Sequence, residues 1–129
     1  MKFKHEKDRY MFHELHAVLQ LIVLDMNWYA ITNFGKSLTI TSTVSTPEED
    51  EKLNRVSKSH LHKIAVDLRA RDFTKAERAE LSDYINYKPE YRKYHYLSMS
   101  GTKRLTFVHD NSNGIHWHTA LHSSLAIKH

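Results

Sequence analysis

The sequence predicts an α+β domain: a small antiparallel sheet with helices packed on one side. Apolar residues between positions 9 and 33 recur every three or four positions, which is the period of a helix with one buried face. A second helical pattern spans residues 74–86, and short alternating or β-branched segments, typical of strands, lie between and after the two helices. This order of helix, two strands, helix and C-terminal strands indicates the α+β class.

Length and composition restrict the protein to an ordinary folded domain. The chain has 129 residues, which suits a single domain covering residues 1–129. Hydrophobic residues make up 40% and charged residues 26%, with 3 Gly and 2 Pro, so disordered and collagen-like classes are excluded. Because there is no cysteine, any metal ion must be held by His, Asp or Glu.

The central elements are predicted from patterning and from end signals. The first helix is expected to stop at Gly35. Residues 38–43 and 64–68 are predicted strands, and the acidic segment 46–55 between them is either a loop or a short helix. Thr74 and Glu77 form a capping box at the start of the second helix, and Pro89 lies beyond its end.

The C-terminal part is predicted to be antiparallel. Residues 94–99 and 104–109 are expected strands separated by Gly101. Residues 111–114 carry strong turn chemistry, so 104–110 and 115–122 should form a hairpin. In that register His109 pairs with His116, and Asp110 pairs with Ile115.

Charge and hydropathy limit the partners. Lys and Arg total 19 against 15 acids, a net charge of +4, which suits an anionic partner. The basic residues are scattered, without the dense run or interleaved aromatics of nucleic-acid modules, so no nucleic-acid partner is expected. The longest apolar run, 17–24, is too short to span a bilayer. The N-terminal residues lack the apolar core of a signal peptide, and we expect synthesis in the cytoplasm without one.

Histidine placement points to a metal site. The chain has 11 His, and imidazole is the commonest neutral metal ligand. His116 and His118 project from one face of an extended strand. Asp67 interrupts an apolar strand, where an unpaired carboxylate would cost several kcal/mol. Two His and one Asp suit a hydrolytic zinc site with one open position, whereas pairing of Asp67 with a lysine is an equal alternative on spacing alone.

The residues His60, Ala65 and Asp67 fit a known motif. The segment resembles the His-x-x-x-x-Ala-x-Asp core of peptidoglycan-cleaving zinc peptidases, which include D-Ala-D-Ala carboxypeptidases and dipeptidases and phage L-alanyl-D-glutamate endopeptidases. Hedgehog signalling domains share the fold of this family. Residues 38–42 look like the preceding strand of the family, and His116-Trp-His118 looks like its closing His-x-His, so the similarity spans roughly residues 15–121.

The resemblance assigns roles residue by residue. It implies that His60, Asp67 and His118 ligate Zn²⁺, and that His116 lies beside the metal and stabilises the oxyanion. The family places an acidic general base shortly before the last His, and the only acid nearby is Asp110, for which a role as base and a role in starting the turn are equally open. The hairpin register puts His109 on the metal-facing side, and a β-bulge would put Asp110 there.

The sequence also departs from the family. Lys58 and Lys63 stand where the family has Ser and Gly, which predicts an altered loop around His60. The family's arginine for the substrate carboxylate has no counterpart at residues 45–46, so Arg55 or Lys58 is expected to bind substrate.

Together these features predict a zinc-dependent peptidase that hydrolyses an amide in the stem peptides of bacterial cell wall, such as a phage lysin that reaches the wall after release. A hedgehog-like zinc module without turnover is the first alternative. A cupin-type iron oxygenase, which also uses two His and a carboxylate, and a nucleic-acid-binding protein are more distant alternatives. The sequence leaves the cleaved bond and the oligomeric state undetermined.

Overall fold

A mixed five-stranded sheet forms the centre of the computed structural model, which describes residues 1–55, 57–98, 100–111 and 114–127. The strand order is β1-β2-β3-β7-β6. The β1–β2 pair is parallel and the other three pairs are antiparallel. The strand bounds are β1 (Lys2–Phe3), β2 (Thr39–Ser42), β3 (Ala65–Arg69), β6 (Thr106–Asn111) and β7 (Gly114–Ala120).

The α+β class is confirmed, but the sheet is not wholly antiparallel. The difference is β1, which adds to the edge of β2 through hydrogen bonds from Lys2 N to Leu38 O and from Lys4 N to Ile40 O, both of 2.8 Å. A strand of two residues is too short to show alternation in the sequence, so its pairing was not predictable from patterning.

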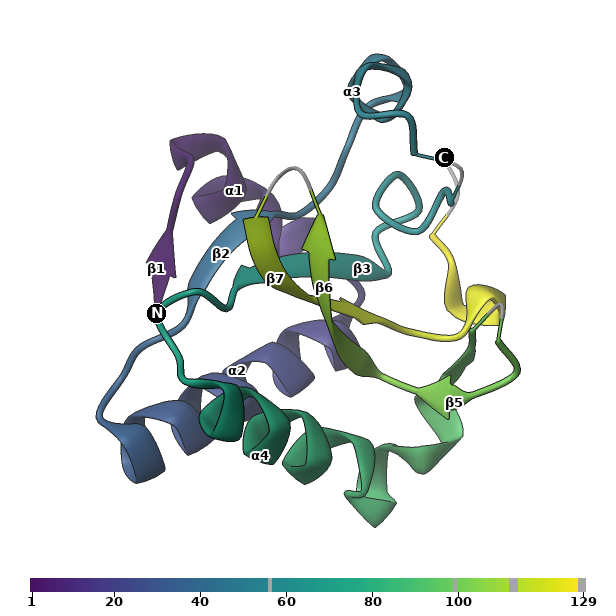
Figure 1. The fold of residues 1–129 in the computed structure, drawn as a ribbon. Coiled ribbons are helices and arrows are strands. Elements are labelled where there is room, and N and C mark those ends of the chain that lie inside the picture. The colour runs from purple at the N-terminus through teal and green to yellow at the C-terminus, as the bar shows by residue number, and fades with distance from the viewer. Residues whose placement is uncertain (56, 99, 112–113, 128–129) are drawn as a thin grey trace.

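Two helices cover one face of the sheet (Figure 1). α2 (Ala17–Phe34) and α4 (Lys75–Asn86) lie side by side beneath the strands. Alternate strand residues Val66, Leu68 and Trp117 are fully buried, and the Trp117 indole donates to Ser82 Oγ of α4 at 3.0 Å. Because side chains alternate along a strand, Asp67 and His118 point to the opposite face, which α2 and α4 do not cover.

The predicted helix 9–33 is divided in the structure. α1 (Glu6–Met11) and the 3-10 turn η1 (Phe12–Glu14) precede α2. Leu15, which follows η1, has an extended backbone. His16 caps α2, because its Nδ1 accepts a hydrogen bond from Val18 N at 3.1 Å. Gly35 ends α2 with φ of 66°, as predicted.

The remaining elements match the predictions in part. The segment 46–55 contains a short helix, α3 (Pro47–Lys52), capped by Thr46. The capping box of Thr74 and Glu77 is present. The predicted strand 94–99 is reduced to β4 (Tyr96–Leu97), which pairs with β5 (Lys103–Arg104) as a separate ribbon, and Met99 lies outside the described residues. Two further 3-10 turns are η2 (Pro89–Tyr94) and η3 (Ser123–Leu125).

The helix α2 is apolar on two sides. Leu19, Ile22 and Met26 are buried against the sheet, whereas Leu24 and Trp28 are about half exposed on the outer side. Among the described residues, no helix has the length and apolar character needed to cross a membrane.

Candidate metal centre

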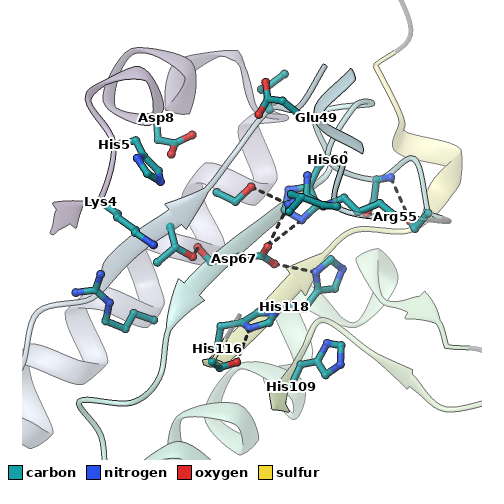
Figure 2. A pocket seen from close by; sticks show the side chains of 18 of the residues that line it. Lys4, His5, Asp8, Glu49, Arg55, His60, Asp67, His109, His116 and His118 are labelled. Carbon is teal, nitrogen blue, oxygen red and sulfur yellow. Dashed lines mark hydrogen bonds and ion pairs between the residues drawn. The ribbon is translucent and has the colours of Figure 1, made fainter. Parts of the chain in front are cut away.

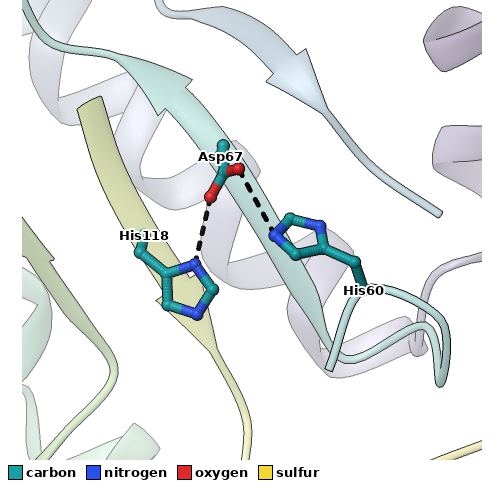
Figure 3. A group of neighbouring side chains, drawn as sticks. All are labelled: His60, Asp67 and His118. Carbon is teal, nitrogen blue, oxygen red and sulfur yellow. Dashed lines mark hydrogen bonds and ion pairs between the residues drawn. The ribbon is translucent and has the colours of Figure 1, made fainter. Parts of the chain in front are cut away.

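Three side chains with metal-binding atoms converge on the face of the sheet opposite α2 and α4. Asp67 lies in the middle of β3, His118 is its direct partner on β7, and His60 comes from the loop before β3. Figure 3 shows both imidazoles turned toward the carboxylate, with His118 Nδ1 3.0 Å from Oδ1 and His60 Nε2 3.3 Å from Oδ2. One potential ligand atom from each residue lies within 4.8 Å of the other two, so the group can hold a metal ion.

His60 is fixed by its other ring nitrogen. The side chain is buried, and Nδ1 lies 2.8 Å from the carbonyl oxygen of Thr43. A carbonyl only accepts, so Nδ1 carries a proton, and Nε2 is the ring nitrogen that faces Asp67 and can give its lone pair to a metal ion once it carries no proton itself. Such a carbonyl partner orients many metal-bound histidines.

The loop that carries His60 has one residue in an unusual backbone conformation. Lys63 has φ of 65°, in the left-handed region that favours glycine. This is the position where the resembling family has Gly. The lysine therefore adopts a backbone conformation typical of glycine, and the chain returns to β3 with Ile64 N donating to Ser59 O at 3.0 Å.

Asp67 is an anion in this setting. Burial raises the pKa of its carboxyl, but the charge of His60 and the hydrogen bonds from His118 and His60 outweigh burial and hold that pKa well below its ordinary value. An ionised carboxylate flanked by two imidazoles is a hard oxygen ligand beside two nitrogen ligands, a set that suits zinc or iron.

The two residues expected to bind substrate lie in different surroundings. Arg55 is largely buried and its guanidinium contacts Asp50 Oδ1 at 3.2 Å, Ser42 Oγ at 3.1 Å and Asp67 Oδ2 at 3.6 Å. These contacts tie the segment after α3 to the metal centre and engage both terminal nitrogens of Arg55. Lys58 is exposed and does not line the cavity.

A cavity of about 840 Å³ opens beside the three side chains (Figure 2). His109 and His116 form part of its wall, with ring centroids 5.3 Å apart. The pairing of β6 with β7 has no bulge, so His109 is opposite His116 as predicted from the turn, and Asp110 is opposite Ile115. Asp110 is exposed and is not among the residues that line the cavity.

The acids in the cavity wall are engaged with other groups. Besides Asp67 they are Asp8 and Glu49. Asp8 is buried and accepts hydrogen bonds from the hydroxyl and the backbone N–H of Thr43. Glu49 forms an ion pair of 2.6 Å with Lys7.

Sequence reasoning missed the N-terminal part of this cavity. Lys4, His5 and Asp8 reach it because β1 and α1 lie against β2. Their placement depends on β1, whose two residues leave no periodic signal. The only available hint was the basic character of the first ten residues.

Comparisons of the chain with protein-family models, with curated proteins and with solved structures give no match. The functional argument therefore depends on the geometry of the site. His60, Asp67 and His118, on which the sequence resemblance depends, are also the residues that the fold brings together.

Proposed function

We propose that the protein is a zinc-dependent peptidase that hydrolyses an amide bond in the stem peptides of bacterial cell wall. The observation that carries the proposal is the convergence of His60, Asp67 and His118 beside an open cavity. Two imidazoles and one carboxylate are the ligand set of hydrolytic zinc sites, which keep a further position for water. A cavity of about 840 Å³ has the size of a pocket for a short peptide.

The residues of the chain have separate tasks in this proposal. Zinc held by the three ligands supplies a Lewis acid and a bound water whose pKa falls to about 7. Thr43 holds His60 in the ligating tautomer, and Asp67 provides the negative charge. His116 projects from the same face of β7 as His118, where its imidazole can donate a hydrogen bond to an oxyanion.

The choice of cell-wall peptide as substrate is supported by the sequence resemblance and by charge. The net charge of +4 favours association with an anionic wall. In this proposal the protein acts on the wall after its release from the cell that makes it, as a phage lysin does.

A second candidate is a zinc-binding module without turnover. Asp110 lies outside the cavity wall, which favours the module without turnover. The acids that line the cavity are Asp67, a proposed ligand, and Asp8 and Glu49, which are paired with other groups. Without a general base the site would bind zinc and stabilise the fold, but would not activate water for attack.

Metal analysis and wall digestion separate these candidates. For the peptidase we expect bound zinc, loss of wall cleavage with chelator, recovery with zinc, and inactive His60→Gln and His118→Gln variants. His62→Gln is the matched control, because His62 is a neighbouring imidazole outside the metal-binding group. Mass spectrometry of the fragments identifies the bond. Stoichiometric zinc without cleavage would support the module, iron with oxygen uptake would indicate an oxygenase, and chelator-insensitive cleavage would contradict the proposal.

A further inference from the structure

The outer face of α2 differs from that of its neighbour α4. Both helices cover the same face of the sheet (Figure 1). The exposed residues of α4 include three charged side chains, Lys75, Glu80 and Asp83. All of α2 is described, and none of its exposed residues is charged: they are Ala17, Leu21, Leu24, Trp28, Ile31, Thr32 and Asn33. A helix that is apolar on both its inner and its outer side is normally buried on both sides.

Four of these residues form a continuous apolar stripe along the outer side of α2. They are Leu21, Leu24, Trp28 and Ile31, which are 56%, 49%, 57% and 48% exposed. Their spacing of three, four and three residues puts them on one side of the helix, and the same spacing forms the seam between paired helices. Together they offer on the order of 400 Å² of apolar surface, about half of the roughly 800 Å² that one partner contributes to a stable interface.

The surface that fits this stripe best is a second copy of the stripe. If two copies of α2 pack antiparallel about a two-fold axis, Leu24 faces Trp28 of the partner subunit, and Leu21 faces Ile31 of the partner subunit. No like charges meet in this contact, because the exposed residues of α2 are neutral. A strongly charged protein would find no complementary charge there. A lipid surface fits less well, since helices that lie on membranes carry Lys or Arg beside their apolar face.

We propose that the protein forms a two-fold symmetric dimer in which the apolar stripes of two α2 helices pack against each other antiparallel. The metal centre lies on the face of the sheet opposite α2, so the dimer leaves both cavities open. The two cavities face away from each other, which lets one dimer contact two sites at once. This inference does not depend on zinc or on cleavage, and it stands or falls separately from the proposed function.

Sedimentation velocity of the full chain measures the dimer. Between about 1 μM and about 300 μM we expect a reversible monomer–dimer equilibrium with a dissociation constant of about 10–100 μM, because the stripe supplies only part of a standard interface. Leu24→Lys and Trp28→Lys each place a charge in the contact. Since a two-fold axis repeats each substitution, we expect either variant to raise the dissociation constant by at least about 30-fold.

The matched control is Leu97→Lys, the same substitution at a leucine that is 61% exposed on β4, away from α2. We expect it to change the dissociation constant by less than about two-fold. Circular dichroism and urea unfolding check that each variant stays folded. A dimer that Leu24→Lys leaves intact, or one that Leu97→Lys weakens equally, would overturn the assignment to α2.

Fluorescence of the wild-type protein gives a second measurement that needs no charged variant. Of the two tryptophans, Trp117 is fully buried, whereas Trp28 is exposed and lies in the stripe. We expect dilution from about 300 μM to about 1 μM to shift the emission to longer wavelength as Trp28 enters water, and Trp28→Phe to abolish the shift. Monomers at every concentration, open-ended assemblies, or dimers without this shift would overturn the proposal. Monomers that sediment with phosphatidylcholine vesicles would overturn it in favour of a lipid surface.

Discussion

Two aspartates with largely buried side chains, Asp25 and Asp67, show how the same functional group serves different purposes in this molecule. Asp25 on α2 accepts from Lys88 Nζ at 2.6 Å and from the hydroxyls of Tyr84 and Tyr91 at 2.7 Å each. Asp67 on β3 has longer contacts of 3.0 Å to His118, 3.3 Å to His60 and 3.6 Å to Arg55. Each carboxylate is surrounded by three side chains, which for Asp25 all lie about 60 residues further along the chain and for Asp67 include the nearby Arg55 and His60.

The difference lies in the chemistry of the partners. At neutral pH, Lys88, Tyr84 and Tyr91 act on Asp25 only as hydrogen-bond donors. Burial raises the pKa of the Asp25 carboxyl, but these hydrogen bonds and the charge of Lys88 outweigh burial and lower it. A neutral imidazole, in contrast, also presents a lone pair, so the neighbours of Asp67 can turn toward a shared cation. Partner chemistry, rather than burial, distinguishes the structural carboxylate from the candidate ligand.

The largest effect expected from this comparison is on metal affinity. Asp67→Asn removes the anionic ligand, and we expect zinc affinity to fall by about 10³-fold, equivalent to about 4 kcal/mol. Asp25→Asn should leave the affinity within about two-fold, because Asp25 is not part of the metal-binding group. Competition with a chromophoric chelator measures both constants. Equal affinities of wild type and Asp67→Asn would remove the basis for a metal centre.

The free energy of unfolding should rank the two variants in the opposite order, with the larger loss in Asp25→Asn. Asp25→Asn leaves Lys88 without its ion pair and weakens two tyrosine hydrogen bonds, so we expect the free energy of unfolding to fall by about 3 kcal/mol. In zinc-free protein at a pH where both imidazoles are neutral, Asp67→Asn should cost less than about 1 kcal/mol, because the contacts of Asp67 are longer and no attraction to a charged imidazole is lost. Urea unfolding of both variants without metal checks the ranking. A larger loss for Asp67→Asn would mean that Asp67 is chiefly structural.

The same two residues show what the sequence can predict. Asp67 was identifiable because it interrupts an apolar strand, and the His116-Trp-His118 segment because period-two alternation puts both imidazoles on one face. The turn at residues 111–114 predicted the register that places His109 opposite His116, and the structure confirms that register. These inferences depend on local geometry, which the sequence encodes directly.

Contacts between distant side chains were not predictable in this way. Asp25 reads as a polar interruption of an apolar helix, and its partners Tyr84 and Tyr91 lie 59 and 66 residues further along the chain. Arg55 reads as a free substrate-binding cation because nothing local shows that the fold places it beside Asp50 and Asp67. Periodicity predicts which face a residue occupies, but not which side chain it meets across the core.

The stabilising role of Asp25 should also depend on alkaline pH, through its partners Tyr91 and Lys88. Burial and the hydrogen bond to Asp25 raise the pKa of Tyr91, and the hydrogen bond to Asp25 raises that of Lys88. Both folded-state pKa values lie above the unfolded-state values, which are about 10 for Tyr and about 10.4 for Lys. The protonated groups therefore stabilise the fold fully below pH ~10. This contribution is lost as pH rises through the folded-state pKa values.

We therefore expect the deficit of Asp25→Asn relative to wild type to shrink by about 1–2 kcal/mol between pH 7 and pH 11. The lowered pKa of Asp25 gives the opposite pH dependence. Its contribution to stability is present above the unfolded-state pKa of about 3.9 and is lost at lower pH. The deficit should thus be greatest between about pH 5 and 9. Urea titrations of both proteins across this range measure it, and a deficit independent of pH would show that Asp25 acts without the charges of its partners.

The smallest effect concerns how the partners of the two aspartates are supported. Lys88, Tyr84 and Tyr91 lie on α4 and the short segment that follows it, whereas His60 is carried by a loop in which Lys63 has φ of 65°. A left-handed backbone costs a non-glycine residue about 1–2 kcal/mol, and glycine relieves this strain but makes the unfolded chain more flexible.

We expect Lys63→Gly to raise the free energy of unfolding by about 0.5 kcal/mol relative to Lys63→Ala. The alanine variant is the control, because it also removes the side chain and its contact with Glu14 at 3.8 Å but keeps the strain. Urea unfolding of the two variants gives the difference directly. If Lys63→Gly is the less stable of the two, the loop that presents His60 is not strained, and the metal-binding histidine is held as firmly as the partners of Asp25.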